Sequence, residues 1–215
     1  MSLLYYSRMR FILTLTPLLS ASPGTAHVIS IFAGGFEDSI KSGEIPIGTP
    51  PQGSYGITGV RKYTTFMKTF FFEELAAKHA GKISFTHIYP GLVDGPTFYS
   101  DVNPLWSRIM WRIFKPLVAW YITSNEDCGA VMVSLATGRY PAKGTVKQGE
   151  ESKVIGGVAF STQRELGGGS YGVGQRGDER KDVSYAKLRK EDTAKRVWEH
   201  TMEVLEGIEQ RDAAS

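Results

Sequence analysis

Apolar side chains recur at steps of three and four between residues 53 and 79, and this spacing predicts one long helix. Short apolar runs at 26–32 and 83–89 flank it, and their composition is typical of buried parallel strands. Gly81 is the natural stop of the helix. A strand, a helix and a second strand in this order predict a βαβ unit. The apolar stripe of the helix consists of Val60, Thr64, Met67, Phe71 and Leu75.

The rest of the chain shows further helical patterns, one more strand pattern and a glycine-rich stretch. Residues 154–160 are expected to form the strand. Residues 167–177 are expected to form a flexible loop, because no Gly-Lys-Ser/Thr follows their glycines and no helix opens from them. Helices are expected at 2–19, 104–122, 124–137 and 192–209.

The composition is that of one ordinary globular domain. The chain has 215 residues, of which 41% are hydrophobic and 22% charged. We expect a single domain with a core over 1–160, an irregular loop over 161–190 and a C-terminal helix over 191–209. A net charge of +3 is too small to predict a nucleic-acid partner. The single cysteine, Cys128, excludes an internal disulfide and favours a reducing, cytoplasmic setting. We predict no metal site.

The first 26 residues superficially imitate a secretory signal, with basic residues, an apolar run and then small residues. However, Arg8 and Arg10 come after an apolar stretch, and Pro17 interrupts the run. A membrane span needs about 20 uninterrupted apolar residues, which this segment lacks. We therefore favour a core helix that leads into the first strand.

The βαβ unit resembles the second half of the short-chain dehydrogenase/reductase family. In that family the first of these strands carries a serine, the helix starts with Tyr-x-x-x-Lys, and the next strand ends in Pro-Gly-x-Val. Here Tyr55 stands at the helix start and Pro90-Gly91-Leu92-Val93 follows the second strand. The segment 197–203 is similar to the divergent fungal-type members. The resemblance implies an α/β fold with a partial Rossmann-like (doubly wound) parallel sheet, the C-terminal half of the family's fold.

The resemblance also implies a hydride-transfer site. The family's tyrosine exchanges a proton with the substrate oxygen, and its lysine lowers the tyrosine pKa and holds the nicotinamide ribose. Tyr55 is accordingly the candidate catalytic residue, and NADP or NAD is the implied cofactor. The candidate cofactor-binding residues are Pro90, Gly91 and Val93.

Three positions depart from the family pattern, and one of them is the asparagine that typical members carry in the preceding helix, since residues 1–16 contain none. Gly59 stands where the lysine is expected, and the nearest cations, Arg61 and Lys62, should project from other faces of the helix. The usual serine position falls near Ala33, whereas Ser30 sits too early on the strand. These departures favour a catalytically inactive relative that binds a ligand or a partner, as the alternative to an active enzyme.

The glycine-rich turn of a dinucleotide-binding half is not found ahead of residue 2. We therefore expect the chain to enter the fold at its fourth helix, and the strand at 27–32 to present an unpaired edge that promotes oligomerisation or insolubility. A truncated gene model is the favoured explanation. A half supplied by another chain and a remnant with another role remain open.

The expected function is that of an NAD(P)-dependent oxidoreductase, or a fragment of one, acting on a hydrophobic carbonyl or alcohol in secondary metabolism. The aromatic segment 104–122 suggests such a substrate, as the wall of an apolar pocket or as a subunit contact. We favour these two roles over contact of 104–122 with a membrane surface. The expected partners are a hydrophobic small molecule and a second copy of the chain.

Overall fold

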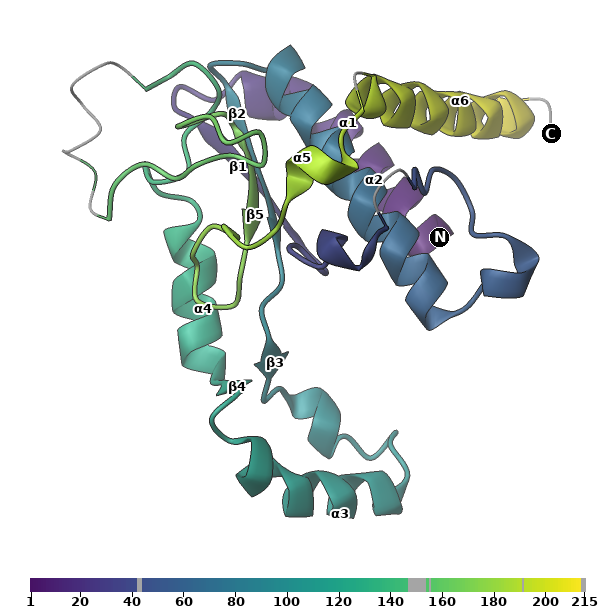
Figure 1. Ribbon diagram of the computed structural model, residues 1–215, viewed down its shortest axis with the longest axis vertical. Coiled ribbons are helices and arrows are strands. Elements are labelled where there is room, and N and C mark those ends of the chain that lie inside the picture. Colours follow the sequence, from purple (N-terminus) through teal and green to yellow (C-terminus); the bar gives the residue numbers. More distant parts are fainter. Residues whose placement is uncertain (42–43, 147–153, 155, 191, 214–215) are drawn as a thin grey trace.

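A computed structural model of the chain describes residues 1–41, 44–146, 154, 156–190 and 192–213. A parallel sheet forms its centre, and an arm ending in a short helix extends away from it (Figure 1). The strands are β1 (Ala26–Ile31), β2 (Ile83–Ile88), β3 (Leu92–Val93), β4 (Ile122–Thr123) and β5 (Ser170–Val173). The α-helices are α1 (Ser7–Ser20), α2 (Ile57–Lys78), α3 (Leu105–Phe114), α4 (Asn125–Ser134), α5 (Tyr185–Leu188) and α6 (Thr193–Ala213).

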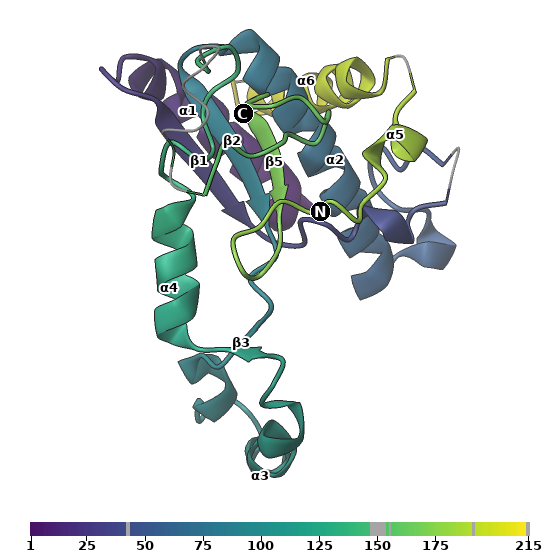
Figure 2. The same cartoon turned by 60° about the vertical axis from the view of Figure 1, so that its left-hand side comes forward.

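The predicted βαβ unit is confirmed. β1 and β2 are parallel neighbours, in a register that pairs Val28 with Phe85, and α2 connects them. α2 begins at Ile57 and ends at Lys78, after which Gly81 has a φ of 78°, the left-handed conformation that only glycine adopts readily. One face of the sheet rests on α1 and α2, and the last turn of α4 and the chain that follows it pack against the other, while α4 itself extends toward the arm (Figure 2). This is the expected α/β, partial Rossmann-like arrangement.

The third strand of the main sheet lies where the sequence predicted a loop. β5 pairs in parallel with β2 inside the glycine-rich stretch 167–177, and α5 also lies in the segment 161–190 that was expected to be irregular. Both predictions were wrong, and at β5 the reason is that glycine serves packing. A side chain at Gly172 would lie 2.1 Å from the hydroxyl of Tyr185, so only glycine permits this contact.

The prediction of a strand at 154–160 was also wrong for the residues of that segment that the structure describes. Phe160 makes one antiparallel bridge with Leu166, and the described residues of the segment form no strand beyond this single bridge. Gly156 and Gly157 have φ angles of 79° and 71°, which interrupt an extended backbone.

The N-terminal segment is a helix with a buried side, as predicted. A π-helical turn, Ser2–Tyr6, continues into α1. Tyr5 is fully buried, and its hydroxyl lies 2.8 Å from Thr201 Oγ1 of α6. Phe71 of α2 stacks on Trp198 of α6, with ring centres 5.0 Å apart. The first helix, α2 and α6 therefore share one core. Within the described residues, no helix combines the length and the apolar character needed to cross a bilayer.

The arm consists of β3, β4 and the helical residues between them. β3 pairs in parallel with β4, and α3 lies at the far end, away from the sheet (Figures 1 and 2). The single helix predicted at 104–122 is divided, because α3 ends at Phe114 and a 3-10 turn, Lys115–Val118, contains Pro116.

Candidate active site

Tyr55 lies in the connection before α2, at the end of the sheet where the strands of open α/β folds bind ligands. The residue is 57% exposed and lines a cavity of about 490 Å³. Phe32 and Ala33, which directly follow β1, line the same cavity, as do Val60 and Arg61 of α2. The phenol is thus free to meet a ligand beside the carboxyl end of β1.

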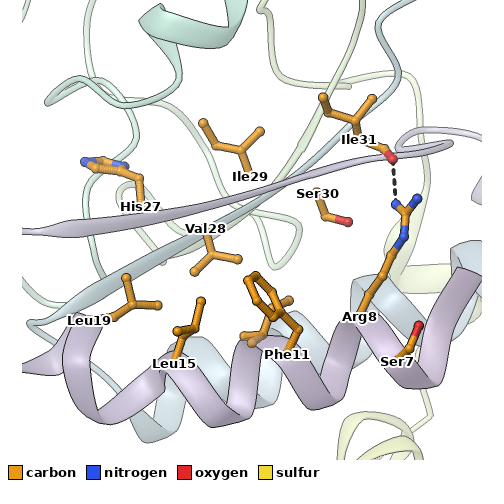
Figure 3. A pocket seen from close by; sticks show the side chains of 11 residues that line it. Ser7, Arg8, Phe11, Leu15, Leu19, His27, Val28, Ile29, Ser30 and Ile31 are labelled. Atoms are coloured by element: carbon orange, nitrogen blue, oxygen red, sulfur yellow. Dashed lines mark hydrogen bonds between the residues drawn. The ribbon is translucent and has the colours of Figure 1, made fainter. Parts of the chain in front are cut away.

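The position expected for the family's serine is occupied by Ala33, which lines the Tyr55 cavity without offering a hydroxyl. Ser30 lines a different groove, of about 700 Å³, between β1 and α1. Figure 3 shows Ser30 and Val28 on the side of β1 that faces α1. This placement agrees with the sequence argument that Ser30 comes too early.

The absence of the family's lysine has a steric reason. A Cβ atom at Gly59 would lie 2.1 Å from the carbonyl oxygen of Ser54. The turn that carries Tyr55 folds back onto the first turn of α2, and only glycine leaves room for it. A lysine at this position is therefore incompatible with the backbone around Tyr55.

The prediction for Arg61 was wrong. Tyr55 precedes α2 instead of belonging to it, so helical spacing does not separate the two residues, and both line one cavity. The guanidinium carbon of Arg61 lies 4.3 Å from the ring centre of Phe36 and 5.9 Å from that of Tyr89. Lys62, in contrast, is paired with Glu44 at 2.6 Å.

The Pro90–Val93 segment follows β2 and Tyr89, and the ring of Tyr89 lies beside Arg61. Gly91 has a φ of 78°, which explains why glycine stands there, and Val93 pairs with Thr123 of β4. The hydroxyl of Tyr89 lies 3.3 Å from that of Tyr121. Burial raises the pKa of Tyr89, which keeps this phenol protonated.

No protein-family model matches the chain. A protein of Stachybotrys chartarum named short-chain dehydrogenase/reductase SAT2 is 49% identical over 213 residues, which are 99% of this chain and 59% of that protein. Oxidoreductase AN1596 of Emericella nidulans is 33% identical, over 95% of this chain and 60% of its own length. Oxidoreductase andH of Emericella variicolor is 29% identical, over 95% and 59% respectively. The chain is similar over nearly its whole length to a fungal short-chain dehydrogenase/reductase. It spans about three fifths of the length of the curated relatives it matches.

The chain contains buried polar groups that sequence reasoning missed. The backbone N–H of Ala33 donates to His87 Nε2 at 3.3 Å, and His87 Nδ1 lies 3.1 Å from Thr69 Oγ1. Thr69 Oγ1 donates to Glu37 Oε1 at 2.5 Å. Nearby, the amine of Lys68 lies 4.7 Å from the ring centre of Phe32 and has no hydrogen-bond partner within the described residues.

Burial changes the charge state of these groups. It raises the pKa of Glu37 to about 7, and it lowers the pKa of Lys68 to about 7. It also keeps the pKa of His87 well below its usual range, with the nearby charges of Lys68 and Arg8 acting in the same direction. In the sequence, Thr69 and His87 stand out only as polar residues within apolar stretches. Spacing alone does not show which residues their side chains contact.

A groove of about 700 Å³ lies beside β1. It is lined by α1 and by β1, and Arg8 reaches across it to donate to the carbonyl oxygen of Ile31 at 3.0 Å (Figure 3). β1 has no second strand partner among the described residues. Within the same residues, no group of three or more His, Cys, Asp and Glu side chains is placed to hold a metal ion.

Proposed function

We propose that this chain forms the catalytic part of an NAD(P)-dependent oxidoreductase that interconverts a hydrophobic carbonyl compound and its alcohol. One observation carries the proposal: Tyr55 is exposed in a cavity at the carboxyl end of a parallel sheet, in a chain similar to a short-chain dehydrogenase/reductase over 99% of its length. The names of the relatives support an oxidoreductase. The substrate, the direction and the preferred nicotinamide are proposals.

Tyr55 is proposed to exchange the proton of the substrate oxygen. The nicotinamide, when bound, supplies or accepts the hydride at the neighbouring carbon. The Tyr55 hydroxyl is exposed in the cavity and is suited to donate its proton to a carbonyl oxygen. Arg61 places a permanent positive charge on the wall of the same cavity, where it would stabilise negative charge that develops during the transfer.

The residues present suit only one end of the cofactor. Pro90, Gly91 and Val93 are proposed to face the nicotinamide end, since they follow β2 at its carboxyl side. The glycine-rich turn that binds the pyrophosphate in such folds is not found in this sequence. We propose that a further segment or a second chain completes the pyrophosphate site along the open edge of β1, and that the contacts to the nicotinamide end alone support micromolar binding.

The exposed apolar face of α3 is proposed to form the wall of the substrate site or a subunit contact. Its apolar residues recur at helical spacing and are exposed. Trp111, on the opposite side of the helix, stacks on Phe98 with ring centres 4.1 Å apart. Such a face suits a hydrophobic substrate. Its exposed members are Leu105, Trp106, Ile109, Met110, Ile113 and Phe114.

A matched pair of variants tests the proposal. The purified chain is titrated with NADPH and NADH by fluorescence, and NADPH oxidation is followed with benzil as a hydrophobic diketone. We expect micromolar binding, about −8 kcal/mol, and loss of turnover in Tyr55→Phe with binding retained. Tyr63→Phe on α2 is the control and should retain turnover. Binding without turnover in the unaltered chain would support the alternative, an inactive ligand-binding relative, which Gly59 and Ala33 favour.

A further inference from the structure

The buried hydrogen bonds between β2, α2 and the segment after β1 form one continuous chain. It runs from the N–H of Ala33 to His87, then to Thr69, and ends at the carboxyl group of Glu37. The backbone groups of Gly35 and Glu37 also favour the charged form of this carboxyl group, whose Oε2 has no hydrogen-bond partner within the described residues. The side chains of Glu37, Thr69 and His87 are at most 1% exposed, so none of them contacts a ligand in the Tyr55 cavity directly.

The backbone fixes the direction of this chain. Since an N–H group of Ala33 donates to His87 Nε2, that nitrogen carries a lone pair and the imidazole is neutral. Its proton is therefore on Nδ1, which donates to Thr69, and Thr69 in turn donates to Glu37. Both imidazole nitrogens are thus occupied by structural hydrogen bonds, and His87 is not available as a general base.

The two ends of this chain of hydrogen bonds lie at the first and the last residue of the segment 33–37. Ala33 lines the Tyr55 cavity, and Phe36 is the ring on which Arg61 lies, at 4.3 Å. Gly34 packs so closely on β2 that a Cβ atom there would lie 2.2 Å from the carbonyl oxygen of His87. The segment is consequently held against the sheet at its start and through the carboxyl group of its last residue.

We infer that His87, Thr69 and Glu37 are positioning residues that fix the segment 33–37, and through Phe36 the guanidinium of Arg61, on the wall of the Tyr55 cavity. This inference extends the proposed function, because it names residues that shape the site without touching the substrate. The physical reason is that the same segment supplies both a wall of the cavity and the stacking partner of its cation. Loss of the middle hydroxyl would free both ends of the segment.

Thr69→Val removes the middle hydroxyl and keeps the size of the side chain, whereas Thr69→Ser keeps the hydroxyl. Thr65→Val is the matched control, because the Thr65 hydroxyl is buried on the same helix and has no partner within the described residues. With NADPH and benzil, we expect Thr69→Val to lower kcat about tenfold or more with little change in KM for NADPH, as for other misplaced groups. Thr69→Ser and Thr65→Val should keep the activity of the unaltered chain.

A second measurement decides the inference even if the chain has no turnover. Imidazole ¹⁵N shifts should show His87 with its proton on Nδ1, and the Ala33 amide should exchange slowly. Both signals should change in Thr69→Val and return in Thr69→Ser. A protonated Nε2, or signals that respond equally to Thr65→Val and Thr69→Val, would overturn the inference. Absence of turnover with these signals as expected would count against the proposed function alone.

Discussion

Glu73 of α2 and Arg189, which follows α5, form a largely buried ion pair, with Glu73 Oε1 and Arg189 Nη2 2.5 Å apart. The same carboxylate oxygen accepts from Thr162 Oγ1 at 2.6 Å. Burial raises the pKa of Glu73, and the charge of Arg189 opposes that change. One carboxylate therefore fastens two parts of the segment 161–190 to the helix that carries the candidate site.

Replacing Arg189 by Met should strongly destabilise the fold, because Glu73 would keep its charge without its partner. Breaking a buried pair on one side costs about 3–5 kcal/mol, and the 30% exposure of the Arg189 side chain places the expected loss at or below the lower end of that range. Urea unfolding at pH 7 measures the loss. Lys78→Met is the control, since Lys78 pairs with Glu74 at the surface and the change should cost less than about 1 kcal/mol. Equal losses in the two variants would contradict the role of Glu73.

The βαβ unit could be predicted from the sequence because its signals are local. The stripe that includes Met67 and Phe71 has the helical period, and the run that becomes β2 is apolar throughout. β5 could not be predicted in this way. Gly172 is dictated by the approach of Tyr185, thirteen residues further on, and composition alone makes such a glycine look like part of a flexible loop.

The candidate site could be predicted only in part. The order of motifs drew attention to Tyr55 and to Pro90–Val93, and the structure places both at the carboxyl ends of strands. Arg61 was assigned to the wrong face because its place depends on where α2 begins, and helix boundaries are the least certain feature of a sequence pattern. The chain through His87 and Thr69 joins residues distant in sequence, which periodicity does not relate.

Gly59→Ala should destabilise the protein, although Ala is usually the better residue within a helix by about 0.5–1 kcal/mol. The added Cβ atom would lie 2.1 Å from the carbonyl oxygen of Ser54, so the turn before α2 must move. Gly129→Ala on α4 is the matched control, because nothing lies within 4 Å of its Cβ position, and it should stabilise the protein. Thermal unfolding shows whether each substitution lowers or raises the Tm of the protein. A stabilised Gly59→Ala variant would show that the turn is not fixed there.

Glu37 should make the fold less stable as the pH rises from about 4.5 to about 7. Its pKa is about 7 when folded and near its ordinary value of 4.5 when unfolded, so the folded state binds more protons over this interval. Glu37→Gln keeps an acceptor for Thr69 and removes the titration. We expect it to stabilise the protein above pH 7 by about 2–3 kcal/mol at most and to have little effect near pH 4.5. Urea unfolding between pH 4.5 and 8 tests this, and parallel curves for the two proteins would contradict it.

Lys68 should have the opposite effect at higher pH and make the fold more stable as the pH rises. Its folded pKa is about 7 and its ordinary value is 10.5, so between these values the unfolded state binds more protons and stability rises with pH. The amine faces the ring of Phe32, and its burial and the positive charge of Arg8 both oppose its protonated form. Together with Glu37 this predicts a stability minimum close to pH 7.

Lys68→Met isolates that contribution, because Met has a similar shape and carries no charge. We expect a gain of about 2–4 kcal/mol at pH 7 that shrinks toward pH 10, measured by urea unfolding at intervals across that range. Lys62→Met is the control, since Lys62 is paired with Glu44 near the surface and should lose a small amount of stability at every pH tested. A Lys68→Met variant that is destabilised at pH 7 would mean that the amine has a partner when the protein is in solution. The cavity wall around Phe32 would then have to include that partner.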